Sequence, residues 1–307
     1  MFMKVDIIMA TYNGESYIEC QILSLIQQTY KDWKLYIHDD GSTDKTLDII
    51  NRLLKIDDRI ILIEDGYSGL KAGKNFLHTL SYSQADYAIF CDQDDIWLES
   101  KIEELFKVMI EKDQFEHPVL VYSDGYAWNE EGCIFPESIS TNHAKDLEDF
   151  IMFNGGYQGC SIMMNRKLID LAIGYDGYIY HHDDVVSLLA HSFGQVYFLP
   201  KQLMLYRQHK GAVTGEKVFI KQKFGGLFNH VGYLISYEHY KFKESFYSIF
   251  KNELSDHNKK IFEFYFGLVE KNNRIFRAFY FLLTPLTFGG KRFKLFSKVL
   301  LQRLFDK

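Results

Sequence analysis

The chain is most constrained by an alternation, over residues 1–125, between short apolar runs rich in β-forming residues and amphipathic helical stretches. This alternation is typical of a mostly parallel sheet with helices packed on both faces, so we predict an α/β domain. The predicted strands span residues 5–10, 34–38, 60–64, 87–91 and 119–122. Between the last two we predict a helix, because apolar residues from Ile102 to Met109 recur at helical spacing, with Lys and Glu on the other face.

The second half of the chain has a different pattern. A glycine-rich stretch, NGGYQG, begins at Asn154 and is followed by the strand-like segment CSIMMN, an acidic HHDD cluster and the strand-like segment QVYFLP. After Gly215 the chain becomes aromatic and basic, with helical stretches and a break near Pro285. We expect the part before Gly215 to shape a second binding site beside the sheet.

Composition bounds the class of protein. With 307 residues, 47% of them hydrophobic, the chain can bury a full core, and its four dispersed cysteines form no CxxC pair, so we expect reduced thiols in a cytoplasmic protein. The first apolar run is too short to span a membrane and resembles a strand more than a signal peptide.

The net charge of −6 conceals an asymmetry. Residues 215–307 contain 17 Lys and Arg against 8 Asp and Glu, a surplus of +9, so residues 1–214 carry −15. An acidic main body argues against nucleic acid as a partner.

Three polar loops follow predicted strands: TYNG from Thr11, DDGSTD from Asp39 and DQDD from Asp92. In parallel sheets, ligands bind beyond the carboxyl ends of the strands, so we expect a site there. Carboxylates as close as those of DQDD repel one another unless a cation neutralises them, and oxygen ligands favour Mg²⁺ or Mn²⁺. The alternative is a solvated loop in which Asp94 or Asp95 caps the next helix.

The other two loops suit a nucleotide. Asp39 and Asp40 can accept hydrogen bonds from a nucleobase N–H or a ribose hydroxyl. Thr11, Tyr12 and Asn13 offer an aromatic face and short polar side chains, which suit the lip of a base site. The alternatives are structural, because the polar residues of DDGSTD can cap the following helix, and Asn-Gly favours a plain turn.

The residues alone do not decide the role of two further clusters. The HHDD cluster, with Asp183 and Asp184, precedes an apolar helical stretch, and its carboxylates can cap that helix, act as a general base or join a His/Asp metal site. In YRQH, Arg207 and His209 can contact a diphosphate or complete a metal shell, and the alternative is an ordinary surface turn.

Taken together, these pieces resemble the family 2 glycosyltransferases, whose fold is the GT-A type, a Rossmann-like α/β domain joined to an acceptor-binding half. The matching segments, in chain order, are VDIIMATYNGESYI, LYIHDDGSTDKT, AGKNF, YAIFCDQDDIW, NGGYQGCSIMMNRKL, HHDDVV and YRQH. DQDDIW and GKNF are most similar to bacterial rhamnosyltransferases of cell-surface polysaccharide synthesis. The resemblance implies a GT-A catalytic domain over 1–214, with a nucleotide-sugar half at 1–125 and an acceptor half at 126–214, followed by a basic helical region at 215–307.

The resemblance also implies roles by position. Thr11, Tyr12 and Asp39 would bind the base and ribose. Asp92 and Asp94 would form the DxD pair, with Asp94 the direct ligand of Mn²⁺ or Mg²⁺. The further candidates on the nucleotide and metal side are Asn13, Asp40, Lys74, Asn75, Arg207 and His209.

HHDD stands where the family often has a Glu-Asp pair, and this places Asp183 at the position of the catalytic base. Because Asp184 is adjacent, an alignment shifted by one residue would assign the base to Asp184 instead. The chain departs from the family at AGKNF, where an arginine that contacts phosphate is often found and where this chain has Lys74 and Asn75. The implied reaction is a direct displacement with inversion, in which Asp183 removes the acceptor proton and the metal stabilises the leaving diphosphate.

The resemblance implies a dTDP- or UDP-sugar donor and a saccharide or lipid-linked saccharide acceptor. Near the C-terminus, RIFRAFYFLL and KRFKLFSKVLLQRLF interleave basic and apolar residues, as helices on anionic membranes do. Membrane binding would place the protein at the inner face of the plasma membrane, and the alternative is a helical appendage that packs on the catalytic domain or on another subunit.

Two other functions compete with transfer of a sugar. A metal-dependent nucleotidyltransferase would also use carboxylates and a nucleotide, but it would be expected to show a basic triphosphate loop near the N-terminus, and residues 11–15 contain no Lys or Arg. A non-catalytic carbohydrate-binding protein could keep the same fold.

Overall fold

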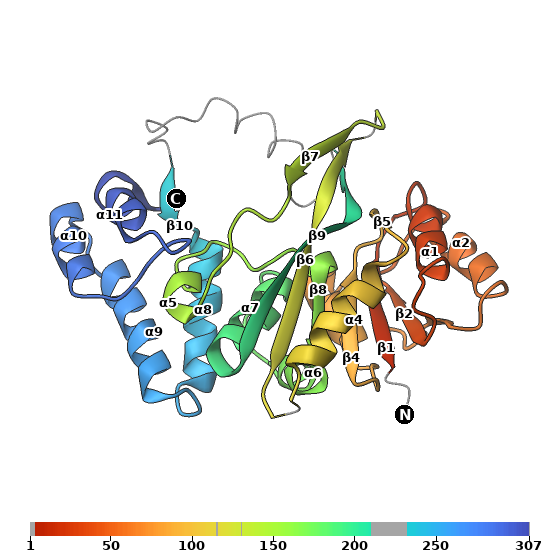
Figure 1. Ribbon diagram of the computed structural model, residues 1–307, viewed down its shortest axis with the longest axis horizontal. Helices are drawn as coiled ribbons and strands as arrows, with labels where there is room; N and C mark the ends of the chain where they lie inside the picture. Colours follow the sequence, from red (N-terminus) through yellow and green to blue (C-terminus); the bar gives the residue numbers. More distant parts are fainter. Residues whose placement is uncertain (1–3, 115, 130, 210–231, 307) are drawn as a thin grey trace.

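The computed structural model describes residues 4–114, 116–129, 131–209 and 232–306. The strands of its central sheet are β1 (Val5–Thr11), β2 (Trp33–Asp39), β3 (Ile60–Leu62), β4 (Tyr87–Cys91), β5 (Ile96–Trp97), β6 (Val119–Asn129), β7 (Ile134–Ser138), β8 (Ile162–Asn165) and β9 (Gln195–Gln208). They lie in the order β3-β2-β1-β4-β8-β6-β9-β5, with β7 paired to β6 (Figure 1).

The sheet is mostly parallel, as predicted. β3, β2, β1 and β4 pair in parallel, and β6 pairs in parallel with β9. Because β8 is antiparallel to both β4 and β6, these six strands all run in one direction. All five strands predicted from the first 125 residues are present, and their carboxyl ends therefore meet at one edge of the sheet.

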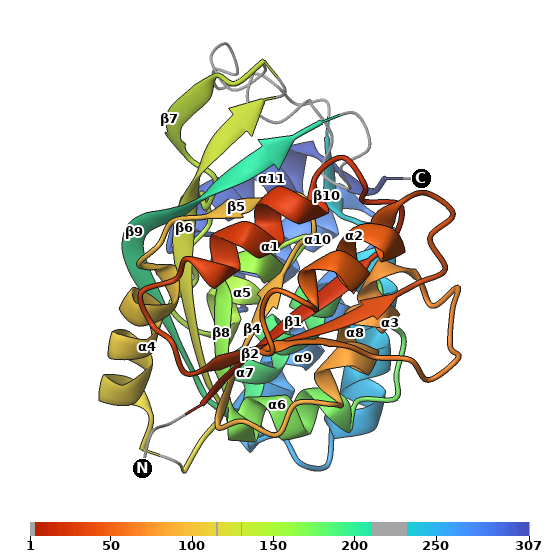
Figure 2. The same cartoon turned by 90° about the vertical axis from the view of Figure 1, so that its right-hand side faces the viewer.

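Helices cover both faces of the sheet. The helices of residues 1–209 are α1 (Ile18–Ile26), α2 (Thr46–Leu53), α3 (Lys71–Leu80), α4 (Lys101–Lys112), α5 (Leu147–Phe150), α6 (Arg166–Ile173) and α7 (His182–Phe193). The cluster with α1, α2 and α4 lies on one face, and the cluster with α3, α5, α6 and α7 lies on the other (Figure 2). The helix predicted around residues 102–109 is α4.

The strands are apolar along their length because both of their faces are buried. In β1, Ile8 packs in one cluster and Ile7 and Met9 pack in the other. In β4, Phe90 and Ile89 divide in the same way. Successive side chains of a strand point to opposite faces of the sheet, and both faces are buried here. The strands are therefore continuous hydrophobic runs in the sequence, without an alternation of apolar and polar residues.

The strand predicted at QVYFLP continues well past Pro200, to Gln208. Pro200 lies where the register with β6 shifts: β6 advances from Tyr122 to Asp124 while β9 advances from Phe198 to Gln202. A bulge tolerates proline, which has no N–H to donate to the ladder. The reading of YRQH as a surface turn was therefore wrong, since Tyr206 to Gln208 end a strand.

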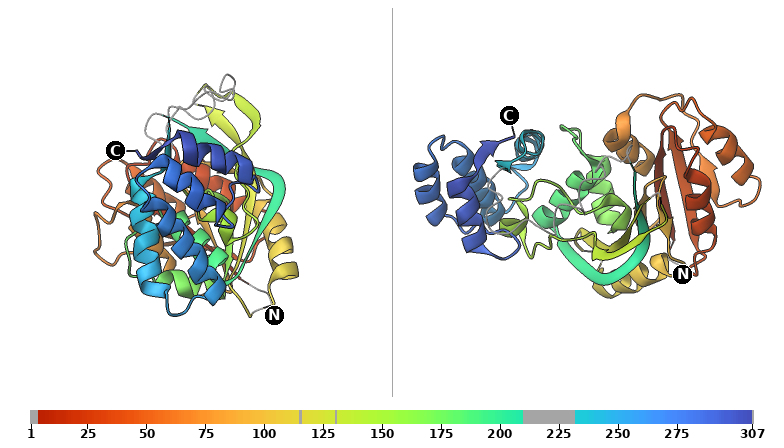
Figure 3. Two further views of the ribbon diagram at one scale, coloured as in Figure 1. Left: turned by 90° about the vertical axis from the view of Figure 1, so that its left-hand side faces the viewer. Right: turned by 90° about the horizontal axis from the view of Figure 1, so that it is seen from above.

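The C-terminal region contains β10 (Tyr233–Ile235), α8 (Tyr237–Phe250), α9 (Asp256–Val269), α10 (Arg274–Leu282), α11 (Arg292–Leu301) and β11 (Arg303–Phe305), with β10 parallel to β11. Phe246 of α8 and Phe262 of α9 belong to the same hydrophobic cluster as Leu188 of α7. Seen from above, α9 to α11 lie at one end of the molecule and α1, α2 and β1 to β3 at the other (Figure 3). Among the helices that the structure describes, none is both long and apolar enough to cross a membrane.

Candidate functional site

Strand pairing brings the DQDD loop and the YRQH segment together. β5 follows the loop directly and pairs antiparallel with β9, with Ile96 opposite Leu205. The backbone N–H of Arg207 donates to Asp95 Oδ1 at 3.1 Å, and Arg207 Nε donates to the Asp94 carbonyl oxygen at 2.6 Å. His209 Nε2 lies 2.8 Å from Asp94 Oδ2. Two segments more than a hundred residues apart thus form one polar site at the carboxyl edge of the sheet.

The guanidinium of Arg207 is held flat between two aromatic rings. Its central carbon lies 3.9 Å from the ring centroid of Trp128 and 4.8 Å from that of Tyr17. The Tyr17 ring also contacts the His209 ring, with centroids 4.8 Å apart. Stacking fixes the plane of the cation, which suits a group that must meet a diphosphate in a defined orientation.

The carboxylates of the loop are crowded and partly withdrawn from water. Burial and the charge of Asp94 raise the pKa of Asp92 to about 7, and Asp183 adds to the effect. Burial, Asp94 and Asp92 raise the pKa of Asp95 well above its ordinary value. Asp95 is 1% exposed, and its Oδ2 has no hydrogen-bond partner among the described residues.

This donor set fits a divalent cation. Ligand atoms of Asp92, Asp95 and Cys160 lie within 4.8 Å of one another, and oxygen donors suit Mn²⁺ or Mg²⁺. Asp94, the predicted direct ligand, is paired with His209 beside this group. Asp95, which the sequence placed in the DQDD group but not among the named metal ligands, is therefore a further candidate ligand.

A buried lysine lies beneath the loop. Lys101 is fully buried at the start of α4, where its Nζ donates to the Cys160 carbonyl oxygen at 2.6 Å and lies 3.9 Å from the Trp97 ring centroid. Its charge opposes the rise in the pKa of Asp92. The prediction that the lysines of this helix lie on its exposed face was wrong for Lys101. Its spacing, four residues before the buried Leu105, was the signal in the sequence.

The nucleotide candidates lie where β1 and β2 end side by side. Thr11 is opposite Asp39 in the ladder, and its Oγ1 donates to Asp39 Oδ2 at 2.8 Å. Tyr12 is 56% exposed, and its backbone forms two hydrogen bonds of 3.0 Å with the side chain of Gln93. This pair of bonds holds an exposed aromatic ring at the rim of the site, next to the DQDD loop.

Asn13 and Asp40 are engaged by neighbouring backbone. The Asn13 N–H donates to Ser42 Oγ, and Asn13 Oδ1 accepts from the Thr43 N–H, each at 2.8 Å. The Asp40 carboxylate accepts from the N–H groups of Leu70 and Lys71, at 2.7 and 2.8 Å. These contacts favour the structural alternative for both residues, since they order the loops on which Thr11 and Asp39 are held.

The two candidates of AGKNF lie differently. Asn75 is buried and makes two hydrogen bonds to His38, accepting from Nδ1 at 2.6 Å and donating to the carbonyl oxygen at 3.2 Å. Lys74 is exposed. The geometry therefore gives Asn75 a role in joining α3 to β2, while the ammonium of Lys74 remains accessible to a phosphate.

Asp183 is the second residue of α7, as the sequence suggested for the HHDD cluster. Its Oδ1 accepts from the Asp184 N–H at 3.0 Å, and the helix N-terminus has no side-chain cap. Burial raises the pKa of the Asp183 carboxyl. Its charge also contributes to the raised pKa of Asp92, so the two carboxyl groups interact electrostatically.

The glycine-rich loop NGGYQG lies directly against the start of α7. A Cβ on Gly156 would stand 2.5 Å from the Asp183 carbonyl oxygen, and one on Gly159 would stand 2.3 Å from His182 Nε2. The His182 ring is stacked on Phe76 at a centroid distance of 3.9 Å. Glycine at both positions permits the close approach that positions the Asp183 backbone.

Asp184 points instead to the protein interior. It is buried, and its Oδ2 lies 3.4 Å from Nε2 of His239 in α8. Burial and Asp183 raise the pKa of Asp184, and burial lowers the pKa of the nearby Lys243 to about 7. His239 and Lys243 lie on the buried face of an aromatic helix, and no motif in the sequence indicated them. This arrangement favours Asp183 over Asp184 as the group open to an acceptor.

Comparison with known proteins identifies the family. The model of glycosyl transferase family 2 matches residues 6–171, over half of the chain. The chain belongs to this family. Asp183, Arg207 and His209 lie beyond the matched part, so their roles rest on the geometry described above and on the resemblance.

Two curated relatives align with about 70% of the chain. It is 28% identical over 231 residues to dTDP-rhamnosyl transferase RfbG of Shigella flexneri, covering 70% of this chain and 76% of that protein. It is 28% identical over 231 residues to glycosyltransferase GlyA of Streptococcus pneumoniae serotype 4, covering 69% of this chain. The alignment spans only 31% of GlyA, which is therefore a much longer protein.

A solved structure confirms the GT-A fold predicted from the sequence. The structure of S. aureus TarS residues 1–349 in complex with UDP-GlcNAc superposes with a TM-score of 0.55 at 19% identity. The match covers 68% of this chain and 60% of the TarS chain. The helical C-terminal region is likewise present as predicted.

Proposed function

We propose that this protein is an inverting glycosyltransferase that moves rhamnose or another hexose from a nucleoside-diphosphate sugar to a saccharide or lipid-linked saccharide acceptor. The observation that carries the proposal is the polar site at the carboxyl edge of the sheet, where Arg207 donates to Asp94 and Asp95 and His209 Nε2 lies 2.8 Å from Asp94 Oδ2. The name of the Shigella relative supports a dTDP-rhamnosyl donor.

On the donor side, the nucleoside would lie between the rim formed by Tyr12 and the hydrogen-bonded pair of Thr11 and Asp39. Arg207, held flat by its aromatic neighbours, would meet the diphosphate. Mn²⁺ or Mg²⁺ held by Asp92, Asp94 and Asp95 would supply Lewis-acid stabilisation of the departing nucleoside diphosphate.

On the acceptor side, Asp183 would take the proton of the attacking hydroxyl. The acceptor oxygen forms a bond to the anomeric carbon while the bond from that carbon to the diphosphate oxygen breaks, and the leaving diphosphate keeps the electron pair. Attack opposite the leaving group inverts the configuration. One carboxylate on the far side of the sugar from the metal group is sufficient for this single displacement.

The test is a panel of UDP-, GDP- and dTDP-sugars, read by thermal shift of the full chain with and without Mn²⁺. We expect one donor class to raise the melting temperature, with EDTA removing the effect. The anomeric configuration of the product, read by NMR, then tests inversion. A chain that responds to no sugar nucleotide, or a product that retains configuration, would contradict the proposal, and a product formed from a nucleoside triphosphate and a sugar phosphate would favour a nucleotidyltransferase.

A further inference from the structure

Helix α10 exposes a large apolar surface to solvent, although it also buries Ala278, Phe281 and an arginine on its inner side. Its side turned to solvent carries large apolar residues, whereas Arg277 is 2% exposed and donates from Nε to the Lys271 carbonyl oxygen at 3.1 Å. Leu283, just after the helix, is 77% exposed. The apolar residues exposed on this side are Ile275, Phe276, Phe279, Leu282 and Leu283. A helix whose outer side faced only water would be polar on that side.

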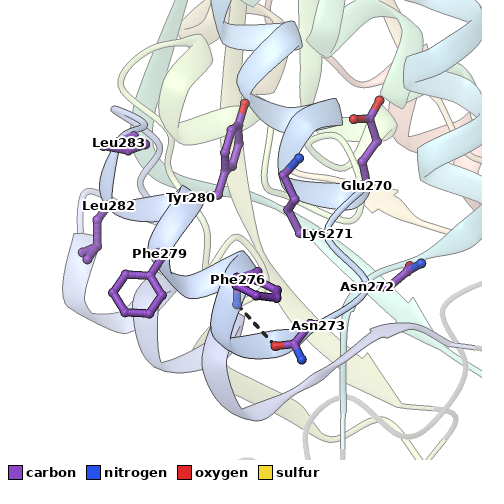
Figure 4. A pocket seen from close by; sticks show the side chains of 9 residues that line it. All are labelled: Glu270, Lys271, Asn272, Asn273, Phe276, Phe279, Tyr280, Leu282 and Leu283. Atoms are coloured by element: carbon purple, nitrogen blue, oxygen red, sulfur yellow. Dashed lines mark hydrogen bonds between the residues drawn. The ribbon is translucent and has the colours of Figure 1, made fainter.

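These side chains border a shallow hollow. Phe276, Phe279 and Leu282 project outward along it, and Lys271 and Tyr280 form its inner side (Figure 4). The hollow has a volume of about 750 Å³ and is open to solvent. It lies at the end of the molecule farthest from α1 and α2 (Figure 1).

Helix α11 extends this surface. Arg292 Nη2 donates to the carbonyl oxygen of Leu282 at 3.1 Å, which ties the start of α11 to the end of α10. The next residue, Phe293, is 83% exposed. We call the exposed apolar residues of 275–283 together with Phe293 the α10–α11 face.

The charge around this face is predominantly positive, and Glu270 is the one carboxylate among the described residues that line the hollow. Residues 271–305 contain no Asp or Glu. They contain eight basic residues: Lys271, Arg274, Arg277, Lys291, Arg292, Lys294, Lys298 and Arg303. Exposed apolar side chains flanked mostly by cations are the composition of helices that lie in the interface of an anionic bilayer.

From this exposed apolar face and its predominantly basic surroundings, we infer that the α10–α11 face docks the protein on an anionic lipid surface, with the phenylalanines and leucines inserted among the headgroups. Helix α10 has nine residues and is about 14 Å long, so it lies along the surface and does not cross it.

A second copy of the chain fits this face less well. A symmetric contact would place the same patch on both subunits and bring two predominantly basic segments together, in which Glu270 alone does not balance the eight basic residues of 271–305. An anionic membrane supplies the missing counter-charge. The α10–α11 face also lies beyond α7 as seen from the nucleotide loops, so docking there leaves those loops away from the bilayer (Figure 1).

The test is co-sedimentation of the full chain with phosphatidylcholine vesicles, with and without phosphatidylglycerol. We expect binding to the anionic vesicles, weakened by salt, and a loss of about tenfold or more in the double variant Phe276→Ser/Phe279→Ser. The matched control is Ile56→Ser, because Ile56 is 64% exposed and lies outside this face. Both variants change exposed side chains, and unchanged melting temperatures confirm that they are folded.

The inference fails if the wild-type chain does not bind anionic vesicles, or if the double variant binds them as well as wild type. It also fails if the wild-type chain is a dimer in solution and the double variant a monomer, because the face would then bind a second copy. None of these measurements uses a sugar donor, so their outcome is independent of the proposed transfer reaction.

Discussion

Substituting Asp183 by Asn tests the assignment of the base most directly. The amide keeps an oxygen that can accept from the Asp184 N–H, so the stability should change by less than about 1 kcal/mol. The amide cannot accept the acceptor proton, and loss of a general base typically costs ~10² to 10⁴ in rate, which corresponds to about 3–5 kcal/mol of activation free energy. We expect turnover to fall by that factor while donor binding persists.

Asp184→Asn is the matched control, one residue along the chain. It replaces a buried carboxyl group that lies near Lys243 and His239. Burial lowers the pKa of Lys243 to about 7, so at neutral pH this lysine can shed its proton, and the expected loss of stability is about 1–3 kcal/mol rather than the larger cost of a fixed charge. Turnover of the folded protein should stay within about tenfold of wild type.

Initial rates of nucleoside-diphosphate release, measured beside thermal unfolding, separate the two variants. The expected pattern is low turnover with a normal melting temperature for Asp183→Asn, and the reverse for Asp184→Asn. The assignment would be refuted by near wild-type turnover of Asp183→Asn. A large loss of turnover in Asp184→Asn at unchanged stability would move the base to Asp184.

Three further predictions concern the metal group, the glycine-rich loop and acid stability. Asp94→Ala should abolish the Mn²⁺-dependent part of the donor's thermal shift, and a shift equal to that of wild type would contradict a role for this carboxylate. Gly159→Ala should lower the melting temperature, because the added Cβ would stand 2.3 Å from a ring nitrogen at the start of α7. Gly174→Ala should be tolerated, because the nearest contact of its Cβ would be at 3.5 Å. Equal melting temperatures of the two variants would argue against the close approach at Gly159. Burial lowers the pKa of His191 from its ordinary value of 6.5 to about 3. Between these two pH values this histidine binds a proton in the unfolded chain but not in the native state. Stability is therefore lost as the pH falls from 6.5 toward 3. His191→Gln should reduce the slope of unfolding free energy against pH in that range by up to about 1.4 kcal/mol per pH unit, as measured by urea unfolding, and an unchanged slope would show that this histidine is not held neutral.

The sheet could be predicted because its information is local. Each of the first five predicted strands is an apolar run bounded by polar turns, and β4 is buried along its whole length and ends at the DQDD loop. The position of a polar loop after a parallel strand is enough to place its carboxylates at the carboxyl edge. The metal and nucleotide candidates therefore come together as expected.

What could not be predicted depends on partners distant in the chain. Nothing near Asn75 indicates that its amide is used by His38, and nothing near Asp184 indicates a lysine on α8. The C-terminal part of β9 was not predicted, because a proline usually marks the end of a strand. In the structure, β9 continues past Pro200 through a bulge because it pairs with β6 and β5. In each case tertiary pairing overrides the local signal.

The hydrophobic cluster that joins α7 to α8 and α9 bears on how such a protein can be altered. Phe246, Phe262 and Phe281 are fully buried in it, and each contributes about 2–3 kcal/mol relative to exposure. Removing residues 232–306 would leave the facing residues of α7 without cover, at a cost that reaches the total stability of an ordinary domain, about 5–15 kcal/mol. The last quarter of the chain is therefore not an exchangeable module. A new acceptor preference or a new membrane affinity has to be built by changing its surface while its inner side is kept.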